Sequence, residues 1–315
     1  MQHWLHVPCD WRRSKLAESY ELFWSPRSSF GQLCPRPTAE QLAAAYAVDY
    51  YTHGDGAPLT EQNGRRGLLS RLREHLAWRG DRGIDLSADH IGSLVAGAAP
   101  LRVCELGCGD GKLLGDLAAL GFETIGIEPD PAARRVAAGR GLKVLDGVAE
   151  QLPAELSPES FDVLVMSHVL EHCSDPLVAM RNVATLLRDG GVAVIETPNN
   201  EALSLRQAAA AWPWLDVPRH LNFFTAASLR LACERASLEV LRIEYVGYCR
   251  NFQQPWLANE ATIRTAFAAH GGKQVSPGQQ ALRSWQLLAA TLLASPRRKY
   301  DSVRVIARRT SRASA

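Results

Sequence analysis

Between about residues 100 and 200, short apolar runs alternate with segments whose apolar residues repeat at helical spacing. The runs are rich in β-branched residues and predict strands at 101–106, 122–128, 142–146, 161–167 and 191–197. Helices are predicted between them at 111–120, 131–140 and 175–188, the last ending at Asp189-Gly190-Gly191. This alternation is typical of a parallel α/β sheet.

The pattern continues to the C-terminal part of the chain. A helix is predicted at 225–237, followed by strands at 238–247 and 302–308. Seven strands in this order predict a Rossmann-like doubly wound sheet over residues 96–315. A helical insertion, at about 250–300, separates the last two strands and includes ALRSWQLLAATLLA.

Residues 1–95 are patterned differently, with many aromatic and charged residues and few alternating runs. Thr38 and Gln41 have the spacing of a capping box and predict a helix start. The run GLLSRLREHLAW at 67–78 predicts a further helix. We therefore expect a helical N-terminal extension over 1–95 that packs on the sheet domain and acts as a lid.

Composition excludes several classes of protein. The chain has 35 Lys and Arg against 33 Asp and Glu, a formal charge of +2, which gives no electrostatic case for nucleic acid. The seven cysteines are an odd number without regular spacing, as in proteins with reduced thiols. No apolar run approaches the ~20 residues of a membrane span, and the first residues lack a signal-peptide core. We expect a cytoplasmic location and no stable membrane insertion.

The stretch VCELGCGDGKLL at 103–114 joins a strand to a helix through closely spaced glycines. Gly107, Gly109 and Gly111 allow backbone N–H groups to approach a ligand, which fits any nucleotide. Glu105 would repel a diphosphate but suits a cationic ligand, and S-adenosylmethionine carries an ammonium and a sulfonium. Glu128 ends the next strand, where a carboxylate can accept both ribose hydroxyls. Asp146 ends the third strand, in position to meet an adenine amino group.

These segments together resemble the class I S-adenosylmethionine-dependent methyltransferases. Their E/D-x-G-x-G-x-G loop, ribose acid and adenine acid are matched, and FDVLVMSHVLEHCSDP and DGGVAVIETPN are typical of the group. HVLEH, TPNN and DVPRHLNFFT narrow the resemblance to the branch of ubiquinone-biosynthesis-like O-methyltransferases and methyltransferases of sugar and secondary-metabolite biosynthesis. That branch often carries a four-cysteine zinc knuckle near its N-terminus. Only Cys9 and Cys34 occur here, so we expect no metal.

The resemblance implies that S-adenosylmethionine is the cofactor. The expected cofactor-binding residues are Glu105, Gly107, Cys108, Gly109, Gly111, Glu128, Pro129, Asp146, Gly147, Val148, Ser167, His168, His172 and Tyr51. Cys108 is also the size of a small filler within the loop. Tyr51 is expected to close over the cofactor from the N-terminal extension.

Methylation of a hydroxyl is helped by a general base, for which a histidine is suited. His220 follows the fifth strand and is the favoured base, although it could instead fix its loop by bonding a carbonyl. His168 is the second catalytic candidate, and His172 is expected to be structural or to lie at the cofactor's edge. Arg219 could pair with an anionic acceptor or with Asp216. The expected substrate-binding residues are Trp212, Trp214, Arg219, Phe223 and Phe224.

The function expected is methyl transfer to a small molecule, most simply to a hydroxyl of a sugar, phenol or natural-product intermediate. The helical insertion would cap the acceptor site, form a homodimer contact or touch a lipid-linked acceptor. The alternatives are an RNA or protein methyltransferase, a dinucleotide-dependent oxidoreductase, which Glu105 disfavours, and a non-catalytic protein that keeps the fold.

Overall fold

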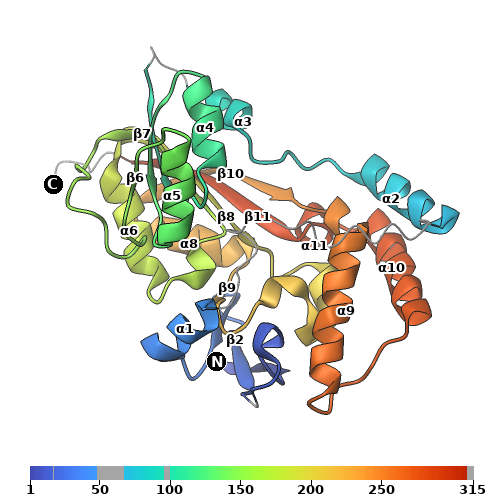
Figure 1. Cartoon of the computed structure of the whole chain (residues 1–315). Helices are drawn as coiled ribbons and strands as arrows, with labels where there is room; N and C mark the ends of the chain where they lie inside the picture. The colour runs from blue at the N-terminus through green and yellow to red at the C-terminus, as the bar shows by residue number, and fades with distance from the viewer. Residues whose placement is uncertain (17, 48–66, 96–99, 311–315) are drawn as a thin grey trace. The chain divides into compact units, whose positions relative to one another are not determined.

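A computed structural model describes residues 1–16, 18–47, 67–95 and 100–310. The chain divides into two compact units. The N-terminal unit comprises Met1–Gly83, Pro198–Thr225 and Tyr245–Ser302, and the Rossmann-like unit comprises Ile84–Thr197, Ala226–Glu244 and Val303–Ala315. Figure 1 gives the labels of their helices and strands.

A seven-stranded sheet in the order β10-β11-β8-β7-β4-β5-β6 forms the centre of the Rossmann-like unit. β4 pairs in parallel with β5 and β7, β5 with β6, and β7 with β8, which confirms the predicted Rossmann-like sheet. The strands are β4 (Arg102–Leu106), β5 (Glu123–Ile127), β6 (Val144–Leu145), β7 (Phe161–Ser167), β8 (Leu187–Pro198), β10 (Leu238–Val246) and β11 (Ser302–Arg309).

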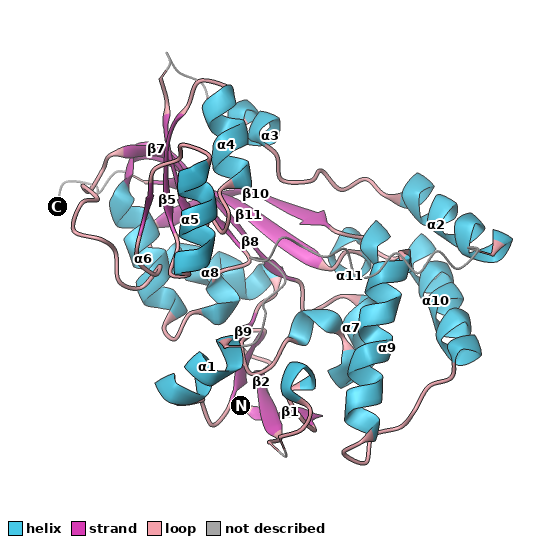
Figure 2. Cartoon of the chain, in the orientation of Figure 1, coloured by secondary structure: helices cyan, strands magenta, loops and turns pink. Residues whose placement is uncertain are grey.

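Helices cover both faces of this sheet. Val163 and Val165 of β7 belong to a buried cluster with Ile91 and Leu117, which come from helices on one face. The intervening Leu164 points to the other face and is also fully buried, as expected for a parallel sheet with two covered faces. Figure 2 shows the helices around the strands; they are α3 (Ala88–Ser93), α4 (Lys112–Ala119), α5 (Pro131–Gly139), α6 (Pro176–Leu186) and α8 (Ala226–Arg235).

The N-terminal unit contains a four-stranded sheet in the order β1-β2-β3-β9, whose neighbours pair antiparallel. The expected helical character of the N-terminal extension over 1–95 is therefore wrong for its first third, which forms β1, β2 and β3. β1, β2 and β3 pair with their neighbours in the chain, whereas the pairing of β3 with β9, about 190 residues further along, leaves no local signal. The strands are β1 (Gln2–Val7), β2 (Tyr20–Ser25), β3 (Phe30–Leu33) and β9 (Asn222–Phe223).

Locally encoded helices of this unit form as predicted. The Gln41 amide donates to Thr38 Oγ1 at 3.2 Å and the Thr38 amide to Gln41 Oε1 at 2.8 Å, so the capping box is present. The insertion between β10 and β11 is helical, as expected. The helices are α1 (Ala39–Tyr46), α2 (Leu68–Gly80), α7 (Leu203–Ala208), α9 (Gln254–Ala268), α10 (Pro277–Leu292) and α11 (Pro296–Lys299).

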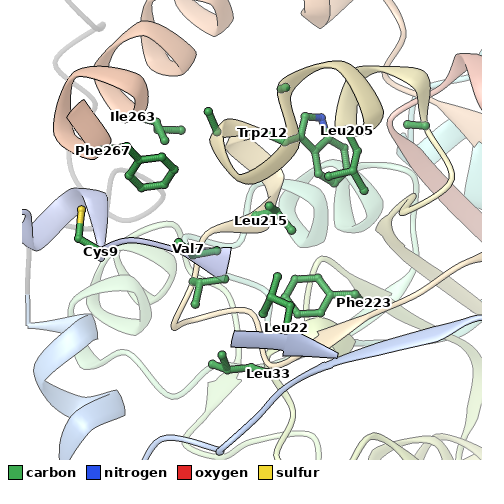
Figure 3. Close-up of a cluster of buried hydrophobic side chains, with 14 of the residues drawn as sticks. Val7, Cys9, Leu22, Leu33, Leu205, Trp212, Leu215, Phe223, Ile263 and Phe267 are labelled. Atoms are coloured by element: carbon green, nitrogen blue, oxygen red, sulfur yellow. The ribbon is translucent and has the colours of Figure 1, made fainter. Parts of the chain in front are cut away.

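A hydrophobic cluster joins the small sheet to the segments that follow β8 and β10 (Figure 3). Leu22 and Leu33 from the sheet pack in it with Trp212, which is 1% exposed, and with Phe267 of α9. The cluster therefore positions the loop 212–224, which carries several of the predicted acceptor residues.

Candidate active site

The strand order of the Rossmann-like unit creates a switch point between β4 and β7. After β4 the chain builds β5 and β6 on one side, and it then returns to build β7 and β8 on the other. The loops that follow β4 and β7 therefore diverge, which is where open α/β sheets bind their ligands. The loop after β4 carries the three glycines, and His168 directly follows β7.

The glycine loop requires glycine for two reasons. Gly107, Gly109 and Gly111 have φ values of 71°, 55° and 77°, in the left-handed region. A Cβ on Gly107 would lie 2.3 Å from Val169 Cγ2, and a Cβ on Gly111 would lie 2.6 Å from Leu142 Cδ1. The loop thus forms a tight cradle that side chains would fill.

Glu128 braces this loop. Its Oε2 accepts from the Gly109 amide and its Oε1 from the Asp130 amide, both at 2.9 Å. The Gly107 amide donates to the Ile127 carbonyl at 2.7 Å, which ties the loop to the end of β5. The predicted ribose acid is therefore held at the loop, buried but with its carboxylate oriented by backbone amides.

Glu105 is the least satisfied acid of the site. It is 6% exposed, and its Oε2 has no hydrogen-bond partner among the residues that the structure describes. Burial, together with the negative charges of Glu128 and Asp110, raises the pKa of Glu105 to about 8. A cation bound beside the loop would satisfy this oxygen and offset the charge, so the residues present fit the ammonium or sulfonium of S-adenosylmethionine.

The third predicted acid is exposed. The Asp146 side chain is 74% exposed, and its Oδ1 lies 2.8 Å from Arg134 Nη1. Arg134 also donates to the carbonyls of Glu128 and Pro129, at 2.7 Å each, so one guanidinium connects the ends of β5 and β6. Gly147 follows directly, and a Cβ there would lie 2.9 Å from Pro153 Cδ. Val148, next in the chain, is 41% exposed.

His168 lies between two carboxylates. Its Nδ1 is 3.3 Å from Glu171 Oε1 and its Nε2 is 3.3 Å from Glu196 Oε1. Burial acts to lower the pKa of His168, but the hydrogen bonds and negative charges of these two glutamates raise it to about 9. Its φ of 54° is unusual for a residue with a side chain. The two flanking carboxylates therefore favour the charged form of the ring, which is a poor proton acceptor.

A chain of buried ion pairs continues from His168 across β8, β11 and β10. Arg304 Nε lies 2.8 Å from Glu196 Oε2, and Arg304 Nη1 lies 2.9 Å from Glu244 Oε2. Burial acts to raise the pKa of Glu196, but His168 and Arg304 lower it to about 2. Glu244 also meets His90 Nε2, at 3.0 Å.

Glu171, Glu196 and Arg304 were not among the residues predicted for the site. The available signals were the acid within HVLEH and the charged positions inside two otherwise apolar strands, at GVAVIET and SVRVIAR. A charge inside a buried strand requires a partner, although the sequence does not say which.

Three other predicted cofactor residues lie in or shortly after β7 or in the glycine loop. Ser167 ends β7, and His172 is half-buried, with its amide donating to the Val169 carbonyl at 2.9 Å. Cys108 is 7% exposed, and burial raises the pKa of its thiol far above the usual range, as for a small filler. Tyr51 lies outside the described residues.

The predicted base His220 belongs to the N-terminal unit. It is 3% exposed, and its Nδ1 lies 2.8 Å from the Trp214 carbonyl. Because a carbonyl only accepts, Nδ1 carries the hydrogen, and in the neutral ring Nε2 carries the lone pair.

Arg219, beside it, is fully buried in a matched set of charges. Its Nη2 lies 2.7 Å from Asp10 Oδ1 and 3.0 Å from Asp216 Oδ1, and Arg12 Nε lies 3.0 Å from Asp216. Burial acts to raise the pKa of Asp216, but Arg219 and Arg12 hold it well below its usual range. Arg219 therefore ties the His220 loop to the N-terminal strands.

The predicted aromatic acceptor residues are mostly packed into the core of the N-terminal unit. Trp212 and Phe223 belong to the cluster of Figure 3, and Phe224 packs on Phe30 with ring centroids 5.1 Å apart. Trp214 is only partly buried and packs on Trp256 at 5.5 Å. Their role in acceptor binding stays a prediction.

The fold and the glycine loop define a class of protein. They form a Rossmann-like domain whose glycine loop is flanked by acids. Beside the loop, one oxygen of buried Glu105 has no hydrogen-bond partner in the part of the chain that the structure describes, which suits a cationic nucleoside cofactor. The sequence profile of the methyltransferase-domain family matches residues 64–243.

Relatives agree with this class. A protein of Cereibacter sphaeroides (strain ATCC 17025) named ubiquinone biosynthesis O-methyltransferase is 31% identical over 178 residues, 54% of this chain and 67% of the relative. A protein of the same name from Ruegeria pomeroyi is 31% identical over 208 residues, 62% of this chain and 79% of that one. The chain belongs to the methyltransferase-domain family and is an S-adenosylmethionine-dependent methyltransferase.

Among solved structures, a methyltransferase from Archaeoglobus fulgidus superposes with a TM-score of 0.49 and 18% identity, covering 75% of this chain and 94% of that one. A Thermotoga maritima methyltransferase, described as a possible histamine N-methyltransferase, has a TM-score of 0.48 and 19% identity, covering 76% and 92%. Within the described residues, no helix has the length and apolarity needed to cross a membrane.

Proposed function

We propose that this protein transfers a methyl group from S-adenosylmethionine to a hydroxyl oxygen of a small-molecule acceptor, with a phenol, a sugar or a natural-product intermediate as the acceptor class. The observation that carries the oxygen assignment is the fixed tautomer of His220, whose Nδ1 is committed to the Trp214 carbonyl. The names of the relatives, which are O-methyltransferases of ubiquinone biosynthesis, support the same choice.

The Rossmann-like unit supplies the donor side. When bound, S-adenosylmethionine supplies a methyl group on a sulfonium, open to in-line displacement. Glu105 would hold the positive charge of the cofactor, Glu128 the ribose hydroxyls and Asp146 the adenine amino group. The glycine loop, fixed by Glu128 and Ile127, keeps its amides in place before any ligand arrives, which lowers the ordering cost of binding.

His220 and His168 divide the roles proposed for the two histidines. His220 Nε2 would accept the proton of the acceptor hydroxyl, because Nδ1 already donates to a carbonyl. Both nitrogens of His168 face carboxylates, so we assign it to charge balance and positioning at the end of β7. Arg219 would act indirectly, by holding the loop that carries His220.

The acceptor is proposed to be small rather than a macromolecule. The net charge of +2 gives no general attraction to RNA, and Trp214 offers a partly exposed aromatic wall suited to a ring. We also propose that the protein acts in a biosynthetic pathway in the cytoplasm and that it forms a homodimer.

Two experiments test this proposal in order. Calorimetric titration with S-adenosylhomocysteine, S-adenosylmethionine and NADH, repeated with Glu128→Ala, tests the donor site; only the adenosyl ligands should bind, and the variant should bind them at least about tenfold more weakly. Transfer of a labelled methyl group to a panel of phenols and sugars then tests the acceptor, and mass spectrometry locates the methylated atom.

His220→Ala should lower the single-turnover rate about 100-fold or more, with donor affinity unchanged. His75→Ala, which changes an exposed histidine, is the matched control. Methylation of nitrogen or carbon only, or an unaltered rate in His220→Ala, would remove the oxygen and base assignments. Methylation of RNA or protein in place of all small acceptors would replace the acceptor class.

A further inference from the structure

One helix of the N-terminal unit exposes its apolar residues. In α2, Leu68 is 84% exposed, Leu69 69%, Leu72 48% and Leu76 39%. Leu68, Leu72 and Leu76 are four residues apart and Leu69 lies beside them, so the leucines form one stripe along the helix. Contiguous apolar surface of this kind indicates an interaction site.

The helix is held by its other side. Arg73, 4% exposed, donates to the Phe252 carbonyl at 3.1 Å, and Ala77, 1% exposed, packs with Tyr248 and Phe252. The leucine stripe therefore contributes little to the packing of α2, because Arg73 and Ala77 attach the helix and leave the leucines exposed. We call the surface formed by Leu68, Leu69, Leu72, Leu76, Arg71, Arg79 and Trp78 the α2 face.

The residues that flank the leucines are basic and aromatic. Arg71 and Arg79 are exposed, and Trp78 is 69% exposed on the same helix. This is the composition of helices that lie in a membrane interface, with leucines in the acyl region, a tryptophan at the boundary and arginines at the phosphates.

A second basic and apolar segment adjoins the C-terminal end of α2. Lys299 Nζ donates to the Gly80 carbonyl at 2.5 Å, and the Arg82 amide donates to the Tyr300 hydroxyl at 2.7 Å. Exposed Leu292 and Leu293 lie three to four residues before α11, which also carries exposed Arg297 and Arg298.

The charge of these two segments is strongly one-sided. Residues 68–82 and 296–299 together contain seven Lys and Arg and two acids; of the seven, Arg73 is buried and Arg297 pairs with Glu201, which leaves five other basic residues against two acids, whereas the whole chain has a net charge of only +2. A symmetric contact between two copies through this surface would bring like charges together. An anionic lipid surface would gain from both the charge and the leucines.

We infer that the α2 face docks this protein on the surface of an anionic lipid bilayer, lying in the interface without spanning the membrane. The inference is independent of which acceptor is methylated, because no residue of the α2 face belongs to the proposed donor or acceptor site.

The test is flotation of the full-length protein with vesicles of phosphatidylcholine, with and without phosphatidylglycerol. We expect binding to the anionic vesicles, weakened at least about tenfold between about 50 mM and about 500 mM salt. Leu72→Asn/Leu76→Asn should also lose at least about tenfold. The matched control Leu120→Asn/Leu241→Asn, which changes exposed leucines of the other unit, should bind as the unaltered chain does.

Arg71→Gln/Arg79→Gln separates charge from apolar insertion. It should lose about tenfold on anionic vesicles, whereas Arg230→Gln/Arg235→Gln on α8 should not. Subtracting the emission spectrum of Trp78→Phe from that of the unaltered chain isolates the fluorescence of Trp78. This emission should shift to shorter wavelength when the protein binds vesicles. All variants change exposed side chains, and circular dichroism checks that they fold.

Several results would overturn the inference. They are failure to float with anionic vesicles at low salt, equal loss in the control variants, and binding that ignores both salt and phosphatidylglycerol. A dimer in sedimentation velocity that Leu72→Asn/Leu76→Asn converts to monomer, without vesicle binding, would assign the α2 face to a second copy of the chain instead.

Discussion

Two groups of buried acidic side chains, one in each compact unit, are balanced in opposite ways. In the N-terminal unit, Asp10 and Asp216 are matched by Arg12 and Arg219, and the pKa of Asp216 is held well below its usual range. In the Rossmann-like unit, Glu105 keeps an oxygen without a partner among the described residues, and its pKa is raised to about 8. In the first group, acids and arginines of the chain neutralise one another. In the second, no cation within the described ranges neutralises the acid beside the glycine loop, so a bound cation can do so. The difference separates fold-stabilising charge from binding charge.

Removing the matching charge should have the largest effect. Arg219→Met leaves two buried carboxylates with Arg12 alone, and we expect the free energy of unfolding to fall by about 4 kcal/mol. Urea unfolding followed by tryptophan fluorescence is the measurement, because all eight tryptophans lie in the N-terminal unit. Arg230→Met, at an exposed arginine, is the control. Equal midpoints for the two variants would show that the matched set contributes nothing.

The second-largest effect is expected at the glycine loop of the Rossmann-like unit. Gly107→Ala adds both left-handed strain and a Cβ 2.3 Å from Val169 Cγ2, and it should cost about 3 kcal/mol. Gly121→Ala has the strain alone, because its φ is 89° and nothing lies within 4 Å of the added Cβ, so it should cost about 1 kcal/mol. Urea unfolding followed by circular dichroism and titration with S-adenosylhomocysteine measure stability and binding. If both variants lost equally in both assays, the close packing at Gly107 would be irrelevant.

The unmatched acid predicts a dependence on pH. A carboxyl whose pKa is about 8 in the folded protein and about 4.3 in the unfolded chain binds more protons when folded between these values. Its contribution to stability is therefore present below pH 4.3 and is lost as the pH rises toward 8, by at most about 1.4 kcal/mol per unit. Glu105→Gln should remove this slope from ligand-free unfolding curves measured between pH 5 and 9.

The same variant should bind S-adenosylmethionine at least about tenfold more weakly, because the charge that faces the cation is gone. Calorimetry at pH 7 in buffers of different ionisation enthalpy gives a second reading. The unaltered protein should release close to one proton on binding, and Glu105→Gln should release none. If the free energy of unfolding changed with pH in the same way in the unaltered protein and in Glu105→Gln, and both released the same number of protons on binding, the unmatched state of Glu105 would be contradicted.

The smallest effect belongs to an exposed pair. Asp146 and Arg134 form an ion pair at 2.8 Å, but the Asp146 side chain is 74% exposed, so Asp146→Asn should change stability by less than about 0.5 kcal/mol. The affinity for S-adenosylhomocysteine should still fall a few-fold, because the amide presents a mixed donor and acceptor to the adenine. Titration with an analogue of S-adenosylhomocysteine that lacks the adenine amino group checks the cause, because the unaltered protein and Asp146→Asn should bind this analogue equally.

The sequence predicted the features that are encoded locally. The glycine loop, the strands beside it and the capping box at Thr38 and Gln41 each rest on residues a few positions apart, and the structure confirms them. The N-terminal sheet was not predicted: β1, β2 and β3 pair locally within a segment of few alternating runs, and the fourth strand, β9, comes from far along the chain.

The partners of the charged residues could not be predicted for the same reason. Asp10 and Arg219 are 209 positions apart, and Glu196 and Arg304 are 108 apart. A sequence shows that a charge interrupts an apolar run, but only the fold decides which opposite charge reaches it. The pairing of Arg219 with Asp216 was one of the predicted alternatives, whereas its pairing with Asp10 was not predicted.

Glu128 has a consequence for redesign of the cofactor site. Both of its carboxylate oxygens already accept backbone amides, one from the glycine loop and one from Asp130. The residue proposed to recognise the ribose thus also holds the glycine loop in its conformation by hydrogen bonding. An engineer who replaces it to admit a different nucleoside would alter recognition and scaffold in a single step, so a new specificity would have to be built together with a new support for Gly109.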